Sequence, residues 1–250
     1  MNPASGVDWA AWLARWERFQ ATYAPDRDGQ FDAICRYAIE FGAKGRLTAV
    51  DLCAGPGSLG ARLLALAPYA EVTAVDIDPF LIELGRRGRL ASPMRWTPAD
   101  LRAPGWSAAL PRCDVALCAT AMHWFDDAEA RAIYREAAAM IRSGGALLVA
   151  DTMPHGADRA RSLGHAMLER FCADEIAAGR GETWVSFWRD AEAEPSFAAL
   201  IAKRHRLLSR RRARVAPPLD FHLAALAEAG FADAGEVWRR DAWAVVLAVR

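Results

Sequence analysis

The sequence lacks an excess of charge of either sign, since 31 lysine and arginine residues balance 31 aspartate and glutamate residues. Without a net charge there is no overall field to attract nucleic acid or an anionic membrane. The five cysteines form no C-x-x-C pair, and no histidines follow them at the spacing of zinc ligands. These absences exclude a disulfide framework or a zinc site as the organising feature, and they predict a reduced, intracellular protein without a bound metal.

Long apolar runs are absent too. No segment reaches the length of a membrane-spanning helix, and the first residues, MNPASGVDWAAW, lack the basic and apolar regions of a secretory signal. We therefore expect a cytoplasmic protein. At 250 residues, 53% hydrophobic and 25% charged, the chain has the composition of an ordinary globular protein. The expected partner is a small molecule rather than nucleic acid or a membrane, and the protein is expected to be a monomer or a homodimer.

Short apolar runs alternate with helical segments in the middle of the chain. The runs are LTAVDL (47–52), EVTAV (71–75), MRW (94–96), DVALCA (114–119) and ALLVAD (146–151). Such alternation is typical of βαβ units, whose strands form a parallel sheet with helices on both faces. Two further runs, GEVWR (235–239) and AWAVVLAV (242–249), are joined so closely that they must be antiparallel neighbours. The prediction is an α/β fold with a seven-stranded, mostly parallel sheet that ends in a C-terminal antiparallel hairpin.

Helical patterns flank this core. Apolar residues recur at helical spacing from Asp8 to Tyr23 and again from Phe31 to Ile39, on either side of a polar break at 25–29. After residue 153 the strand pattern stops, and helix-like stretches at 161–178, 183–193 and 197–205 replace it. An insertion of this length in an α/β domain is typical of a lid or substrate-binding cap. We therefore divide the chain into an N-terminal helical lid (1–44), an α/β core (45–152), a helical cap insertion (153–215) and a C-terminal helix and β-hairpin (216–250).

The most informative segment is AVDLCAGPGSLG, residues 49–60, where a strand runs into a glycine-rich turn that opens a helix. Glycines allow a ligand to approach the backbone, and the helix N-terminus presents N–H groups with partial positive charge. Gly55, Gly57 and Gly60 satisfy G-x-G-x-x-G, and Asp76 follows at the distance of a ribose-binding acid. A nicotinamide-dependent oxidoreductase is therefore one alternative.

Two carboxylates favour a different ligand. Asp51 precedes the glycines, where a pyrophosphate has no use for a negative charge but a ligand with an ammonium group does. Asp100, in PADL after the third strand, is placed to accept a hydrogen bond from an exocyclic amine such as that of adenine. The expected ligand is therefore cationic and carries such an amine.

The segments AVDLCAGPGSLG, VTAVDIDP, PADL, DVALCATAMHWF and MIRSGGALLVAD, in this order and spacing, resemble the successive motifs of the class I S-adenosylmethionine-dependent methyltransferases. The resemblance covers residues 45–151 and the C-terminal hairpin, and the sequence departs from the family's glycine signature at Cys53 and Pro56. It implies a Rossmann-like fold, S-adenosylmethionine as cofactor, S-adenosylhomocysteine as product and a small metabolite as methyl acceptor. An NAD(P)-dependent oxidoreductase and a non-catalytic S-adenosylmethionine-binding protein remain the alternatives.

The resemblance also implies roles for individual residues in binding the cofactor. The residues expected to face the methionine part are Asp51, Cys53, Gly55 and Gly57, with Asp76 on the ribose hydroxyls, Ile77 on adenine, Asp100 and Leu101 beside the adenine amine, and Ala119 beside the reacting centre. The segment TYAPDR is similar to a motif that precedes the first strand in family members, where Tyr23 and Arg27 would approach the methionine carboxylate. Arg27 is equally compatible with a solvated loop position.

His123 is the candidate catalytic residue. It lies in AMHWF after the fourth strand, at the sheet edge where α/β folds bind ligands, and imidazole is a common general base. The alternative is a histidine that packs with Trp124 and positions the cofactor. We favour this alternative because no acidic residue can be assigned from the sequence to orient the imidazole.

Four residues of the insertion are candidates for binding the acceptor. His155 follows the fifth strand, Trp184 and Trp188 lie one helical turn apart as an aromatic wall, and Arg189 is placed to meet a carboxylate. Packing in the core of the cap is the alternative for both tryptophans. The basic run 203–214 lacks the aromatic residues of a nucleic-acid surface, so we expect it to form a solvated face of the cap. The sequence identifies neither the acceptor nor the element that is methylated.

Overall fold

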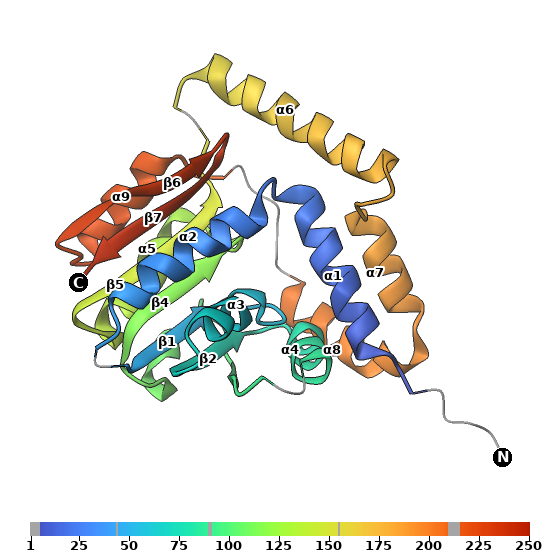
Figure 1. Ribbon diagram of the computed structural model, residues 1–250, viewed down its shortest axis with the longest axis horizontal. Coiled ribbons are helices and arrows are strands. Elements are labelled where there is room, and N and C mark those ends of the chain that lie inside the picture. The colour runs from blue at the N-terminus through green and yellow to red at the C-terminus, as the bar shows by residue number, and fades with distance from the viewer. Residues whose placement is uncertain (1–5, 44, 90–91, 155, 210–215) are drawn as a thin grey trace.

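A seven-stranded sheet forms the centre of the protein, with strand order β3-β2-β1-β4-β5-β7-β6 (Figure 1). The computed structural model describes residues 6–43, 45–89, 92–154, 156–209 and 216–250. The strands are β1 (Leu47–Leu52), β2 (Ala70–Asp76), β3 (Arg95–Pro98), β4 (Cys113–Ala119), β5 (Ile141–Thr152), β6 (Asp233–Arg240) and β7 (Trp243–Val249). Neighbouring strands among β1–β5 are parallel, whereas β7 is antiparallel to both β5 and β6. The predicted α/β fold with its C-terminal antiparallel hairpin is confirmed.

Helices cover both faces of the sheet, and each face has its own apolar core. Their bounds are α1 (Trp9–Tyr23), α2 (Arg27–Glu40), α3 (Ser58–Leu66), α4 (Pro79–Gly88), η1 (Trp106–Ala109), η2 (Met122–Trp124), α5 (Asp127–Met140), α6 (Asp158–Ala177), α7 (Trp184–Ala193), η3 (Pro195–Phe197), α8 (Ala198–Leu208) and α9 (Leu219–Glu228). Ile34 of α2 and Leu63 of α3 belong to one core, and Tyr134 of α5 and Leu226 of α9 belong to the other. The central strands are buried on both faces, which accounts for their continuous apolar runs.

Aspartates fix the starts of several helices. Asp78 accepts hydrogen bonds from the first turn of α4, which begins with Pro79, and Asp126 forms a reciprocal capping box with Glu129 at the start of α5. Asp26 adopts a left-handed conformation and caps α2. This helix therefore begins inside the stretch that the sequence suggested as a polar break, because an aspartate cap needs only one residue outside the helix.

A third apolar cluster joins α1 to the inserted helices. Phe19 of α1 stacks on Phe187 of α7, with ring centroids 5.4 Å apart and planes 16° apart. Phe80 of α4 and Phe197 before α8 complete the packing. α6 differs from these helices, because none of its residues is buried and it runs across one end of the molecule (Figure 1). Among the described residues, no helix is long and apolar enough to cross a membrane.

Candidate functional site

A cavity of about 460 Å³ lies where the carboxyl ends of β1, β2 and β4 meet α1 and α7. Its lining includes ten of the residues predicted for the site: Tyr23, Arg27, Asp51, Cys53, Gly55, Asp76, Ala119, His123, Trp184 and Trp188. A small adjoining pocket is lined by Ile77, Asp100 and Leu101, and it shares Cys53, Asp76 and Trp124 with the cavity. The structure therefore brings the predicted residues of the core and of the flanking helices to one edge of the sheet.

Asp76 organises the glycine-rich turn after β1. One of its carboxylate oxygens accepts the Gly55 N–H at 2.7 Å, and the other accepts the N–H of Asp78 at 2.8 Å. Cys53 and Gly55 both have positive φ angles, 53° and 55°. Cys53 thus adopts a conformation that glycine takes without strain, at the position where the sequence departs from the glycine signature.

Gly57 lines neither the cavity nor the adjoining pocket. It precedes α3 with φ 74°, and a Cβ atom there would lie 2.9 Å from the side chains of Met94 and Trp96. Its backbone conformation and the close packing against β3 require glycine, so the structure gives it a role in shaping the turn rather than in lining the cavity.

Asp51 is buried at the end of β1, and its carboxylate accepts a hydrogen bond from the Gly60 N–H at 2.9 Å. Burial raises the pKa of Asp51 to about 7, because that hydrogen bond compensates only in part and the nearby charge of Asp76 acts in the same direction as burial. A cationic group beside this carboxylate would favour its ionised form, in agreement with the ammonium partner that the sequence suggests.

Asp100 lies at the adjoining pocket with its carboxylate already engaged. One oxygen accepts both the backbone N–H and the side-chain Nε–H of Arg102, each at 3.0 Å. A carboxylate oxygen has two lone pairs and the second oxygen adds two more, so this ion pair still permits a further donor such as an adenine amine.

Tyr23 and Arg27 line the cavity through contacts with neighbouring helices. The hydroxyl oxygen of Tyr23 accepts the backbone N–H of Trp184 at 3.1 Å. Arg27 donates to Glu17 at 2.7 Å, and its guanidinium lies 4.4 Å from the centroid of the Phe31 ring. The Arg27 side chain is only 15% exposed, so the alternative of a solvated loop residue is wrong.

Glu17 of α1 is a residue that the sequence analysis missed. Besides Arg27 it binds Arg89, and it accepts the hydroxyl proton of Ser58, the first residue of α3, at 2.7 Å. It thereby joins α1, α2 and the glycine-rich turn. Nothing in the helical pattern of α1 distinguishes Glu17 from an ordinary solvated residue, since its partners are distant in the sequence.

His123 belongs to η2 and lines the cavity. Its ring nitrogen Nδ1 lies 2.8 Å from Asp151 Oδ1, and its backbone N–H donates to Asp151 Oδ2 at 3.1 Å. Thr152 also donates to Asp151, through its backbone N–H at 2.7 Å. An acidic residue that could not be assigned from the sequence therefore orients the imidazole: it is Asp151, at the end of β5.

The charge of Asp151 fixes which ring nitrogen carries the proton. Burial raises the pKa of this carboxyl, but the charge and hydrogen bonds of His123 and the Thr152 N–H outweigh it and hold the pKa below its ordinary value. An ionised carboxylate only accepts hydrogen bonds, so Nδ1 of His123 must be the protonated nitrogen. The basic lone pair of the neutral imidazole is then on Nε2.

Trp184 and Trp188 of α7 both line the cavity, with ring centroids 5.6 Å apart. Trp184 lies 6.4 Å from Trp124 and remains 40% exposed, whereas Trp188 is 6% exposed. Trp188 therefore has both of the roles considered for it: it lines the cavity and it packs in the apolar core of the cap. Trp184 is the more accessible of the two aromatic walls.

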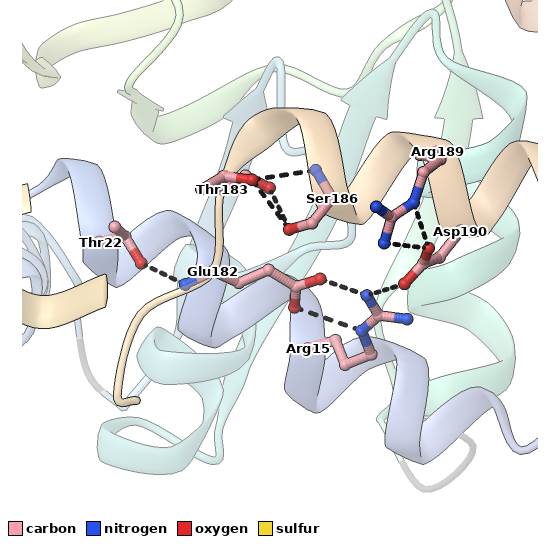
Figure 2. Close-up of polar contacts among 7 residues, drawn as sticks. All are labelled: Arg15, Thr22, Glu182, Thr183, Ser186, Arg189 and Asp190. Atoms are coloured by element: carbon pink, nitrogen blue, oxygen red, sulfur yellow. Dashed lines mark hydrogen bonds and ion pairs between the residues drawn. The ribbon is translucent and has the colours of Figure 1, made fainter. Parts of the chain in front are cut away.

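Arg189 does not reach the cavity. It points to the outer side of α7, where it pairs with Asp190, and Arg15 of α1 binds both Asp190 and Glu182 (Figure 2). The prediction that Arg189 meets an acceptor carboxylate is corrected, because a residue next to Trp188 is rotated by about 100° around the helix. The hydrogen bonds and ion pairs of Arg15 instead connect α7 to α1. Thr22 of α1 adds a further contact by accepting the Glu182 N–H at 2.9 Å.

Arg204 of α8 lines the cavity and is another residue that the sequence analysis missed. Its Nε–H donates to Asp78 at 2.7 Å, and its guanidinium lies 3.6 Å from the Trp188 ring centroid. The expectation of a solvated basic face is therefore wrong at this position, since the Arg204 side chain is 12% exposed. A run of arginines gives no signal for which one turns inward.

Two further predictions concern His155 as a residue of the acceptor site and the absence of a metal site. His155 lies outside the described residues. Within the described part of the chain, no group of three or more histidine, cysteine, aspartate or glutamate residues could hold a metal ion.

Comparisons with known proteins place similar sequences among the methyltransferases. The model of a family described as "Methyltransferase domain" matches residues 49–145. A trans-aconitate 2-methyltransferase of Azoarcus sp. (strain BH72) is 36% identical over 128 residues, which cover 51% of this chain and 45% of the relative. The chain spans about half the length of the curated relatives it matches.

Solved structures share the fold at low identity. A Nostoc punctiforme protein provisionally assigned as an O-methyltransferase has a TM-score of 0.60 and 16% identity, covering 97% of this chain and 60% of that one. Human N-acetylserotonin methyltransferase, in complex with S-adenosylmethionine, has a TM-score of 0.54 and 17% identity, covering 100% and 60%. At these identities the likeness establishes the common fold.

Proposed function

We propose that the chain is a class I S-adenosylmethionine-dependent methyltransferase that transfers a methyl group from S-adenosylmethionine to a small molecule bound beneath α1 and α7. The match of residues 49–145 to the methyltransferase-domain family and the shared fold support this proposal. The observation that carries the proposal is the single cavity lined both by the carboxylates Asp51 and Asp76 and by His123. The two carboxylates suit the binding of a cationic nucleoside, and His123 suits a proton transfer beside it. A volume of about 460 Å³ is within the usual range of small-molecule sites.

The residues present fit this cofactor. Asp51 has a pKa raised to about 7 in a buried position, so it gains from a cation such as the methionine ammonium group. Asp76 would bind the ribose hydroxyls, and Arg27 would bind the methionine carboxylate. Ile77 and the residues beside it in the adjoining pocket would hold the adenine ring.

The cofactor, when bound, supplies a sulfonium methyl group that is already activated for transfer. The protein must therefore align an acceptor with the carbon–sulfur bond and exclude water, which is where positioning contributes most. α1 and α7 cover the cavity and perform the second task. His123 would receive the acceptor proton on Nε2, with Asp151 stabilising the resulting imidazolium.

Two measurements test the proposal. Calorimetry should show binding of S-adenosylhomocysteine and none of NADH, and S-adenosylmethionine should be consumed when an acceptor is present. Binding of NADH alone would support the oxidoreductase instead. Binding of S-adenosylhomocysteine without transfer to any of a broad set of hydroxyl, amine, thiol and carboxylate acceptors would support the non-catalytic alternative.

A further inference from the structure

The part of the cavity lined by His123, Trp124 and Trp184, which we call the acceptor half, indicates which kind of acceptor it would bind. Building on the methyl transfer proposed above, we infer that the acceptor is a neutral, planar aromatic compound and that its hydroxyl oxygen receives the methyl group. Three features of the described residues carry this inference: the His123–Asp151 pair, the aromatic walls around it, and the pairing of Arg204 with Asp78.

The His123–Asp151 pair distinguishes acceptors by their need for a base. A carboxylic acid ionises near pH 4 and is already a nucleophile at neutral pH, so it needs no base. A phenolic hydroxyl ionises near pH 10 and is a poor nucleophile until its proton is removed. Placing an oriented imidazole at the cavity wall, with Nδ1 held 2.8 Å from a buried carboxylate, therefore suits a hydroxyl acceptor.

Aromatic side chains surround this pair. His123 lies 5.0 Å from Trp124, which faces Trp184 at 6.4 Å, and Tyr23 and Trp243 also line the cavity. Trp184, which lines this wall, is 40% exposed. A planar ring stacked there would cover it, and such ring pairs gain energy beyond the area they bury.

The charged groups of the lining argue against an acidic acceptor. Of the two arginines that line the cavity among the described residues, Arg27 is assigned to the methionine carboxylate of the cofactor, and Arg204 already pairs with Asp78. A carboxylate on the acceptor would compete with Asp78 for the Arg204 guanidinium group. A neutral hydroxyl compound requires no such exchange.

The chemical step balances without any further reactant. The acceptor O–H bond breaks and its proton forms a bond to His123 Nε2, while the oxygen forms a bond to the methyl carbon and the carbon–sulfur bond breaks. The products are a methyl ether, S-adenosylhomocysteine and an imidazolium whose proton is later lost to solvent.

The test compares acceptors that share one ring system. With the intact protein and S-adenosylmethionine, we would measure formation of S-adenosylhomocysteine in the presence of 2-naphthol, 2-naphthoic acid, 2-naphthylamine, decahydro-2-naphthol or trans-aconitate. The naphthol is expected to exceed each of the others in kcat/KM by about 100-fold. Preferred methylation of an acid, the amine or the saturated alcohol would overturn the inference while leaving the proposed function intact. So would failure to methylate the naphthol when S-adenosylhomocysteine binds. A protein that does not bind S-adenosylhomocysteine would instead refute the proposed function.

Variants of the wall give an independent check. Trp184→Leu is expected to raise the KM for 2-naphthol about tenfold, because a ring contact is lost, with the affinity for S-adenosylhomocysteine unchanged. Trp184→Phe should recover most of this loss. The matched control is Val185→Ala, since Val185 is 72% exposed on the same helix and does not line the cavity. An unchanged KM in Trp184→Leu would overturn the proposed stacking.

Discussion

Replacing Arg204 by methionine tests how the inserted helices are held against the cofactor half of the site. The Asp78 side chain is 2% exposed and the Arg204 side chain 12%, with Nε 2.7 Å from the carboxylate. Removing one partner of such a pair costs about 3–5 kcal/mol, because the other charge remains buried. In the variant, Asp78 would still accept hydrogen bonds from the N–H groups of Phe80 and Leu81 at the start of α4. The N-terminus of a helix stabilises a carboxylate by about 0.3–1 kcal/mol, which reduces the loss. The lost stacking on Trp188 adds about 0.5–1 kcal/mol, so the expected loss of unfolding free energy is about 4 kcal/mol.

The assay is urea unfolding at pH 7 of four proteins: wild type, Arg204→Met, Asp78→Asn and the double variant. Asparagine keeps the helix cap but removes the charge, so the double variant should be less destabilised than the sum of the two singles by about 2 kcal/mol. Arg206→Met on the same helix is the matched control, since Arg206 is exposed, and its effect should stay below about 0.5 kcal/mol. Equal m-values are required for the comparison. Additivity within about 0.5 kcal/mol would refute the reasoning.

The remaining predictions concern the cofactor carboxylates and the His123–Asp151 pair. Asp76→Asn should weaken binding of S-adenosylhomocysteine by about 2–3 kcal/mol in calorimetry, because a charged hydrogen-bond acceptor is lost; unchanged affinity in a folded variant would remove the assignment of Asp76. Because burial raises the pKa of Asp51 from 3.8 to about 7, the ligand-free folded state binds this proton more tightly than the unfolded chain. The resulting stability is fully present below about pH 4 and is lost as the pH rises to 7, so Asp51→Asn should flatten the dependence of Tm on pH between 4 and 7; equal slopes in both proteins would contradict this. His123→Asn should lower kcat by about two to four orders of magnitude with cofactor affinity nearly unchanged, and a loss below about tenfold would leave His123 with a packing role. Asp151→Asn should lower the apparent pKa in the pH profile of kcat/KM, because the imidazolium loses a negative partner; an unshifted profile would show that Asp151 does not tune His123.

The core of the protein could be predicted from the sequence because its signals are local. The run 47–52 predicts β1 with both of its bounds, and Asp78 followed by Pro79 predicts the start of α4. Such features depend on residues a few positions apart, where the periods of strands and helices and the chemistry of caps apply directly. The two-residue link at 240–241 likewise leaves only an antiparallel pairing for β6 and β7, because a parallel crossover needs many more residues.

The missed residues depend on contacts between distant parts of the chain. Arg204 meets Asp78 across 126 positions, and Glu17 meets Ser58 across 41. Which side chain of a helix turns inward depends on the helix it meets, and Arg189 shows the consequence. It is adjacent to Trp188, yet it points to the outer side of α7 and pairs with Asp190. Sequence spacing alone fixes the relative directions of these residues but not which direction faces the cavity.

A signal for Asp151 was available in the sequence. The apolar run 146–151 ends in an aspartate, as the run that forms β1 does near its own end, and β4 and β5 were both expected in one parallel sheet. The carboxyl ends of adjacent parallel strands meet at one edge, so the residues that follow β4 must lie near the last residues of β5. The pairing of Ala119 with Ala150 places His123 and Asp151 on this edge. Adjacency of the two strands, which the sequence did not establish, was the missing step.

The two halves of the cavity differ in how they are built, and this difference explains why the cofactor is easier to infer than the acceptor. The cofactor half is formed by strand ends and one turn, and Asp51, Gly55 and Asp76 are placed by the sheet itself. The acceptor half depends on α7, which is held against α1 by the Arg15–Glu182 ion pair (Figure 2) and by the stacking of Phe187 on Phe19. A change in the insertion can therefore reshape the acceptor half without disturbing the sheet edge. Methyl transfer can thus be inferred from the fold, whereas the acceptor has to be inferred from the chemistry of the individual side chains that face it.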